Sequence, residues 1–232
     1  MLELRKSSDR GVARFNWLES RHTFSFGSYD DPKHQGFSDL LVINDDRVQP
    51  GTGFDTHSHR DMEIFTYVLQ GALEHKDSTG TGSVVRPGDV QLMTAGSGIR
   101  HSEFNPSESE PVHFYQIWLL PDQEGLAPSY DQRAFPEEER RGKLRVVASP
   151  GGRDGSLTIH QDAEVLLTSL TAGERVTHEL APGRHAWLQI LRGSAQLNGV
   201  SLATSDGAAV SDESSLVVLA TEPCEVMLFD LP

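Results

Sequence analysis

Short runs of β-type residues, each closed by a turn, recur along the chain and restrict it to an all-β fold. Residues 40–43 are apolar and stop at Asn44, and residues 62–69 stop at Gly71. Residues 112–120 form a longer run that is rich in aromatics. No segment before residue 120 shows a helical period. This spacing indicates β-sandwiches or β-barrels.

The second half of the chain repeats this pattern. Asn198-Gly199 is a strong signal for a two-residue hairpin. Residues 121–142 hold three prolines and an acidic run, which is typical of a linker with at most one helical turn. The further strands are expected at residues 144–148, 156–160, 165–170, 186–192, 216–220 and 226–229. We therefore expect an N-terminal domain at 1–125, a linker at 126–143 and a C-terminal domain at 144–232.

The two halves are weak repeats of each other. Residues 68–71 (VLQG) match residues 190–193 (ILRG). At almost the same offset upstream, His57-Ser58-His59 falls on residues 178–180, where the second histidine is replaced by a leucine. This comparison predicts two related barrels, of which only the first keeps its chemistry. Residues 1–40 precede the first barrel core, which leaves room for an N-terminal strand that crosses to the second barrel.

The charge balance excludes several classes of partner. Lys and Arg number 20 and Asp and Glu number 34, giving a net charge of -14 that repels nucleic acid and anionic membrane surfaces. The longest apolar run, residues 216–220, is too short to span a bilayer. No apolar segment of a secretory signal is visible at the N-terminus. Cys224 is the single cysteine, so no internal disulfide is expected and a reducing, cytoplasmic location is the default.

Two histidine-containing pairs carry the chemistry. His57 and His59 are two residues apart, and so are His101 and Glu103. Residues i and i+2 of a strand point to the same face. If the two strands are neighbours in a barrel, three imidazoles and one carboxylate converge inside it. Such a set suits Fe, Ni, Cu, Mn or Zn and leaves positions open for a ligand.

The spacing of the residues does not decide which carboxylate binds the metal. Glu63 has the same strand parity as His57 and His59, whereas Glu103 has the parity of His101. Either carboxylate is compatible with a metal bound among these histidines, so the choice needs information beyond the spacing.

The two-part pattern resembles the cupin motifs, with an extended segment at residues 94–98 that lacks the usual proline. Three strings make the resemblance more specific, because they look like the pirin family: WLESRHTFSFGSY at residues 17–29, FDTHSHRDME at 54–63 and MTAGSGIRHSE at 93–103. The resemblance extends from Leu4 to the C-terminus. It implies a bicupin, with two jelly-roll-like cupin barrels and one metal in the N-terminal barrel. The ligands that it implies are His57, His59, His101 and Glu103.

The resemblance also implies an activity, because it includes bacterial pirin-like proteins with quercetin 2,3-dioxygenase activity. We expect a metal-dependent dioxygenase that cleaves a flavonol with O2 to a depside and carbon monoxide, with Glu103 as the base. Iron is the first expectation for the divalent metal, and Ni, Cu, Mn, Co and Zn are alternatives. The alternative function is a metal- or redox-sensing regulator that binds a protein partner. A cupin without oxygen chemistry ranks third, because fold does not determine function.

Other residues have weaker assignments. Glu63 is a candidate for orienting a ligand histidine. The candidates for the pocket wall are His113, Met93, Phe24, Phe26, Phe65 and Tyr115. The remaining histidines have no partner pattern and are interpreted as structural or surface residues: His22, His34, His75, His160, His178 and His185.

Overall fold

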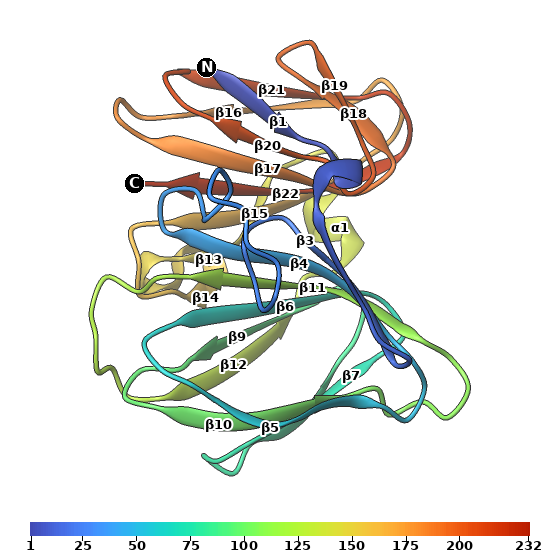
Figure 1. Ribbon diagram of the computed structural model, residues 1–232. Helices are drawn as coiled ribbons and strands as arrows, with labels where there is room; N and C mark the ends of the chain where they lie inside the picture. The colour runs from blue at the N-terminus through green and yellow to red at the C-terminus, as the bar shows by residue number, and fades with distance from the viewer. The chain divides into compact units, whose positions relative to one another are not determined.

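The computed structural model describes residues 1–232 and divides the chain into two β units (Figure 1). Each unit combines a seven-stranded sheet with a four-stranded sheet. The predicted all-β fold with two cupin barrels is confirmed. The N-terminal barrel comprises Gly11–Phe135 and Ile159–Gln161. The C-terminal barrel comprises Met1–Arg10, Pro136–Thr158 and Asp162–Pro232.

The N-terminal barrel holds eleven strands in two sheets. The larger sheet has the order β12-β9-β6-β11-β4-β3-β2, and the smaller one has the order β5-β10-β7-β8. The strands are β2 (Gly11–Arg14), β3 (Leu18–His22), β4 (Leu40–Val48), β5 (Gly53–His59), β6 (Glu63–Gln70), β7 (Leu73–Asp77), β8 (Gly82–Val85), β9 (Asp89–Thr94), β10 (Ile99–Phe104), β11 (Val112–Leu119) and β12 (Ser129–Ala134).

The C-terminal barrel repeats this plan. Its larger sheet has the order β1-β20-β17-β22-β15-β13-β14, and its smaller sheet has the order β16-β21-β18-β19. The strands are β1 (Leu2–Arg5), β13 (Arg145–Ser149), β14 (Leu157–Thr158), β15 (Glu164–Leu170), β16 (Arg175–Glu179), β17 (His185–Arg192), β18 (Ser194–Leu197), β19 (Val200–Ala203), β20 (Gly207–Val210), β21 (Ser215–Ala220) and β22 (Cys224–Leu231). Helix α1 (Glu137–Arg140) and two 3₁₀ segments (Ser7–Asp9 and Pro150–Gly155) complete it.

The domain boundaries differ from the expected ones at two strands. β1 pairs with β20, so the first strand of the chain belongs to the C-terminal barrel. β12 lies inside the expected linker of residues 126–143 and pairs with β9 as an edge strand of the N-terminal barrel. Its exposed polar side chains lack the apolar alternation that reveals a buried strand. In strand order, β1 occupies the place in its sheet that β12 occupies in the other.

The glycine of the repeat has the same physical role in both barrels. Gly71 follows β6 at φ 79°, and Gly193 follows β17 at φ 73°. A Cβ on Gly71 would lie 2.9 Å from the Pro111 oxygen, and a Cβ on Gly193 would lie 2.0 Å from the Pro223 oxygen. Only glycine combines this backbone conformation with so close an approach. The shared strand–glycine pattern thus reflects the same tight turn. Asn198 and Gly199 likewise form the predicted two-residue hairpin between β18 and β19.

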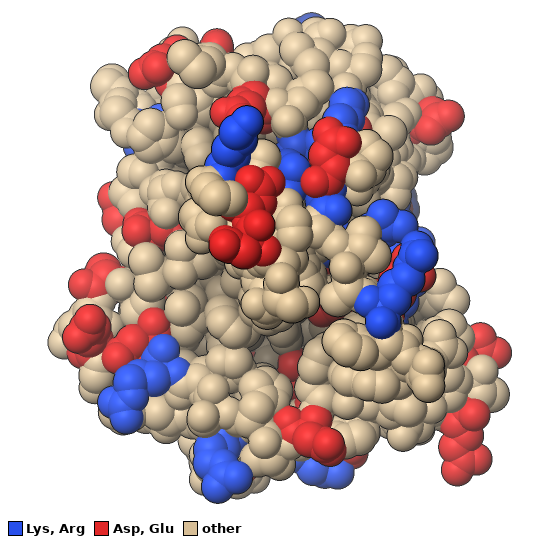
Figure 2. All heavy atoms as spheres, viewed as in Figure 1, with Lys and Arg blue, Asp and Glu red and all other residues tan.

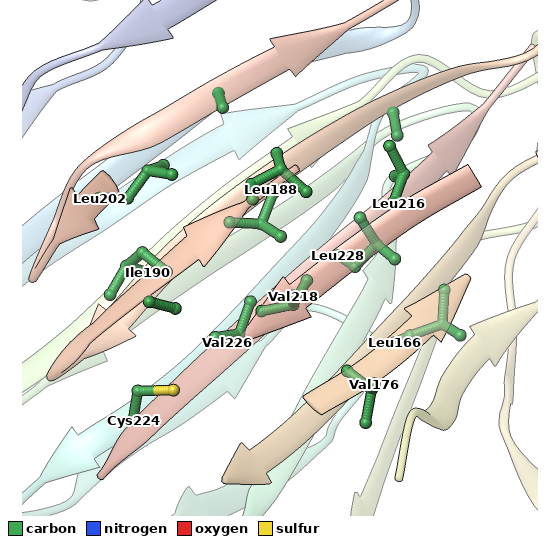
Figure 3. Packing of buried hydrophobic residues seen from close by; sticks show 14 of the residues in the cluster. Leu166, Val176, Leu188, Ile190, Leu202, Leu216, Val218, Cys224, Val226 and Leu228 are labelled. Atoms are coloured by element: carbon green, nitrogen blue, oxygen red, sulfur yellow. The ribbon is translucent and has the colours of Figure 1, made fainter. Parts of the chain in front are cut away.

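Apolar side chains fill the C-terminal barrel, as Figure 3 shows for part of the cluster. Leu188, Leu216 and Leu228 are fully buried in it. His178, which aligns with a histidine of the first motif, lies 2.6 Å from the Asp230 carboxylate, and Leu180 is buried. The two groups of side chains whose geometry could hold a metal ion both lie in the N-terminal barrel.

Charged side chains of both signs are interspersed on the face shown in Figure 2. None of the helices is long and apolar enough to cross a membrane.

Candidate metal centre and cavity

Three histidines meet where β5 and β10 run side by side (Figure 1). His101 on β10 stands directly opposite His57 on β5, and His59 follows two residues further on the same face. One potential ligand atom from each of the three rings lies within 4.8 Å of the others. Two predicted pairs from distant parts of the sequence are therefore brought together by antiparallel pairing.

The hydrogen-bond partner of His57 determines its tautomer. Its Nδ1 lies 2.8 Å from the backbone oxygen of Asp55. A carbonyl only accepts hydrogen bonds, so Nδ1 carries the proton. In the neutral ring, Nε2 of His57 is therefore left with an available lone pair.

Two further buried side chains, His75 and Asp77, determine the tautomer of His101. The His75 Nε2 atom lies 2.9 Å from the Asp77 carboxylate, and both side chains are fully buried. Burial opposes ionisation of Asp77, but hydrogen bonds from Thr79, His75 and the Thr81 backbone outweigh it and hold its pKa below the usual value. Nε2 of His75 therefore donates, and its Nδ1 faces Nδ1 of His101 at 3.4 Å. Consequently Nδ1 of neutral His101 donates a hydrogen bond. Its Nε2 is bare, which means that it carries no proton and has an available lone pair.

The two bare Nε2 atoms of His57 and His101 lie 3.0 Å apart. Two lone pairs at this distance repel each other, whereas ligands at right angles, each about 2.1 Å from a shared cation, are separated by about 3 Å. Burial, reinforced by neighbouring histidines, lowers the pKa of His101 to about 3. The same causes lower the pKa of His59 to about 4, so both rings are neutral at neutral pH. The donor set therefore fits a divalent cation.

Glu103 is only 1% exposed and is held by two donors. The Gln116 Nε2 atom donates to Oε2 at 2.8 Å, and the Thr66 hydroxyl donates to Oε1 at 3.5 Å. A ligand atom of Glu103 lies within 4.8 Å of those of His101 and His75. His101 thus belongs to both groups and links the carboxylate to the other two histidines.

A cavity of about 730 Å³ opens beside His57 and His59. Aromatic rings form much of its wall, including Trp17 and Phe54 in an edge-to-face pair at 5.1 Å, and Phe26 and Trp118 in another at 5.4 Å. The lining residues are Ala13, Phe15, Trp17, Leu18, Ser20, His22, Phe26, Gly27, Ser28, Asn44, Asp46, Gly51, Thr52, Gly53, Phe54, Asp55, His57, His59, Phe104, Gln116 and Trp118.

Several expected pocket residues lie elsewhere. Phe26 lines the cavity, but Phe24 is buried outside its lining. Met93 packs with Ile64, Ala95 and Ile99, because it belongs to a separate apolar cluster. Phe65 and Tyr115 are likewise buried away from the cavity wall.

The two other candidates, His113 and Glu63, contact residues outside the histidine cluster. His113 bonds at 2.7 Å to Asp45, on the face of β4 opposite to that of Asn44 and Asp46. Glu63 is buried, and its carboxylate lies 3.6 Å from the His160 ring. Burial raises the pKa of Glu63. Its partners are thus distinct from those of the histidine cluster.

The interpretation of His75 as a structural or surface residue overlooked its contact with His101. One signal was present in the sequence, because His75 and Asp77 share strand parity. This parity gives no information about which strand β7 pairs with. In the structure β7 pairs with β10, and this pairing places His75 opposite Glu103. Tertiary pairing was needed to relate this pair to the histidine cluster.

Two cupin barrels in one chain, one of which carries a histidine and carboxylate cluster beside a cavity, define a bicupin with a metal-binding site. Family comparison agrees: residues 4–119 match Pirin, and residues 146–231 match the quercetinase C-terminal cupin domain. The chain belongs to the pirin family.

The relatives match over nearly the whole chain. A protein named quercetin 2,3-dioxygenase from Escherichia coli strain K12 is 50% identical over 232 residues, covering 100% of this chain and 99% of the relative. A pirin-like protein from Caulobacter vibrioides is 43% identical, with 97% and 98% coverage. The crystal structure of the bacterial pirin YhhW from Escherichia coli in complex with nickel(II) superposes with a TM-score of 0.96 at 49% identity, covering 100% of this chain and 99% of the other.

Proposed function

We propose that this protein is a metal-dependent dioxygenase that cleaves a flavonol such as quercetin with O2. The observation that carries the proposal is the pair of bare Nε2 atoms of His57 and His101 in a cluster beside an aromatic-lined cavity. A cavity of about 730 Å³ is large enough for a planar three-ring ligand. The relative named quercetin 2,3-dioxygenase supports the same reaction class.

Our assignment of the ligands is His57, His59, His101 and Glu103, holding one divalent transition metal. When bound, this metal supplies Lewis acidity and redox chemistry to the substrate. Three imidazoles and a carboxylate accept Fe, Ni, Cu, Mn, Co or Zn, and iron is our first choice. The nickel(II) complex of the YhhW relative supports a divalent metal at this type of site.

Glu103 is our candidate for the base. Gln116 and Thr66 hold its carboxylate in place, and a carboxylate oxygen accepts the proton of the flavonol 3-hydroxyl. In the overall reaction, both atoms of O2 enter the depside. C3 of the flavonol leaves as carbon monoxide together with its own oxygen. The aromatic wall shields the reacting face of the substrate from water.

Substitution Glu103→Gln is expected to retain part of the metal and to reduce turnover by about 10²- to 10⁴-fold, because the amide cannot accept the hydroxyl proton. The measurement is the loss of flavonol absorbance per bound metal. Glu63→Gln is the matched control, since Glu63 is equally buried but pairs with His160. A wild-type rate per metal in Glu103→Gln would assign the base role to another group.

The His75–Asp77 pair is expected to act on the metal through His101. His75→Phe keeps a ring beside Tyr130, whose centroid lies 4.6 Å from that of His75, but removes the acceptor of the His101 proton. We expect metal affinity to fall about 10- to 100-fold, as for other partners that orient a ligand histidine. Competition with a chelator measures this affinity. Asp77→Asn, which keeps an acceptor oxygen, should have a smaller effect; equal affinities in all three proteins would contradict the assigned role.

The proposed function is tested by aerobic turnover of quercetin with metal-quantified protein, with carbon monoxide release measured together with the loss of the flavonol band. Many turnovers per metal are expected. Failure with fully loaded protein and several metals would favour a regulatory protein that senses its metal and binds a protein partner.

Flavonol and O2 are the partners that this function requires. We infer a cytoplasmic location, because the single cysteine, Cys224, is buried and unpaired as in proteins of reducing compartments. The net charge of -14 is unfavourable for direct contact with nucleic acid or anionic lipid.

A further inference from the structure

Four polar side chains form one part of the cavity wall, which we call the polar floor: Ser20, His22, Asn44 and Asp46. They come from two adjacent strands, with Ser20 opposite Asp46 and His22 opposite Asn44. Each is at most 4% exposed. A compact group of polar side chains is thus buried in the wall of a cavity whose lining also includes many aromatic rings.

Three members of the polar floor have an atom without a hydrogen-bond partner: His22 Nδ1, Asn44 Oδ1 and Asp46 Oδ1. The fourth, Ser20, bonds to the Asp46 carboxyl. The His22 ring is bonded to the Phe26 backbone, so its Nδ1 is the free acceptor of a neutral ring. Burial lowers the pKa of His22 and favours that neutral form. Buried polar atoms are costly unless they are hydrogen-bonded, so a ligand that displaces water here must supply partners.

The character of these atoms selects the ligand chemistry. His22 Nδ1 and Asn44 Oδ1 only accept, so they require a ligand that donates. Burial raises the pKa of Asp46 to about 7. The charges of Asp45 and Glu103 add to the effect, whereas a hydrogen bond from Ser20 and the charge of Arg47 oppose it. The Asp46 carboxyl can therefore donate or accept. The floor favours neutral hydroxyl groups over carboxylates and phosphates, which bring only acceptors and negative charge.

The polar floor is connected to the metal centre through one side chain. Gln116 on β11 stands opposite Asn44 on β4 and donates to Glu103. His57 and His59 line the same cavity as the polar floor. A planar ligand with two or three rings in this cavity can therefore reach the histidines with one end and contact the floor with the other.

We infer that the polar floor binds the ring hydroxyls of a polyhydroxylated aromatic ligand, at the end remote from its metal-chelating group. The position of the chelating end rests on the proposed function. The floor then determines specificity: an aromatic ligand of the same shape without these hydroxyls leaves buried acceptors unsatisfied.

Two flavonols test this inference. Quercetin and 3-hydroxyflavone share the chelating hydroxyketone, but only quercetin has hydroxyls on the outer rings. Binding to metal-loaded protein is followed without oxygen by quenching of tryptophan fluorescence, since Trp17 and Trp118 line the cavity. We expect wild-type protein to bind quercetin at least about tenfold more tightly. The double variant Ser20→Ala with Asn44→Ala should reduce this ratio to about twofold by weakening quercetin alone.

Two controls separate recognition from folding. Ser20→Thr keeps the hydroxyl and should keep the preference, and Thr168→Val removes a buried hydroxyl from the C-terminal barrel and should not change it. Equal affinities in the wild type, equal weakening of both flavonols in the double variant, or no binding of either flavonol would overturn the inference. Turnover is measured separately. A high binding ratio without turnover would refute the proposed function alone, and turnover with a ratio near one would refute this inference alone.

Discussion

Replacement of His101 by alanine is expected to abolish both metal binding and quercetin turnover. His101 is the residue shared by the two groups of potential ligands, and its Nε2 lies 3.0 Å from that of His57. Its loss removes one donor and also disconnects the Asp77–His75 chain. We expect metal affinity to fall by more than the roughly 100-fold seen when only a partner of a ligand is lost. Metal content after dialysis and flavonol turnover per chain measure the two effects.

His178→Ala is the matched control for His101→Ala, because this histidine bonds to Asp230 in the C-terminal barrel. It should leave the metal stoichiometry unchanged. Circular dichroism checks that the His101→Ala variant still folds. Full metal occupancy in a folded His101→Ala protein would show that the ligand assignment is wrong.

The substitution Asp46→Asn is expected to stabilise the metal-free protein at high pH. Burial raises the pKa of Asp46 from 3.8 to about 7, so the folded state binds its proton more tightly than the unfolded state does. Stability therefore decreases as pH rises from the unfolded pKa to the folded one, and the full cost is present above it. Asparagine resembles the protonated acid but does not ionise. Its advantage over aspartate should increase by roughly 3 kcal/mol between about pH 5 and about pH 8.

Denaturant unfolding at these two pH values, in the presence of a chelator, measures this effect. The chelator is needed because a bound cation near Glu103 changes the field at Asp46. Asp131→Asn on the exposed face of β12 is the control and should show no comparable trend. Parallel stability curves for the Asp46→Asn and wild-type proteins would contradict the buried-acid interpretation.

Local patterns were sufficient to predict the all-β class, the duplication into two barrels and the pairs His57/His59 and His101/Glu103. The physical reason is that strand alternation is a property of neighbouring residues. It places i and i+2 on one face whatever the rest of the chain does. The glycine of the repeat can also be interpreted from the sequence, because a tight turn at positive φ requires it in both halves.

Long-range pairing decided the remaining features. β1 joins the C-terminal barrel through β20, and β12 completes the N-terminal sheet although its residues are polar. His75 reaches His101 only because β7 pairs with β10. Such edges and contacts depend on which strands become neighbours, and this choice minimises exposed backbone and apolar surface over the whole barrel.

The polar floor likewise depends both on local sequence patterns and on long-range strand pairing. Ser20, His22, Asn44 and Asp46 have ordinary local contexts in the sequence, and the apolar run of residues 40–43 stops at Asn44. In the structure β4 continues to Val48, and pairing with β3 brings the four side chains together in one cavity wall. Alternation along each strand is a local property and determined which residues could share a face. Whether that face met solvent, core or a cavity depended on the three-dimensional packing, because burial is a property of the assembled barrel.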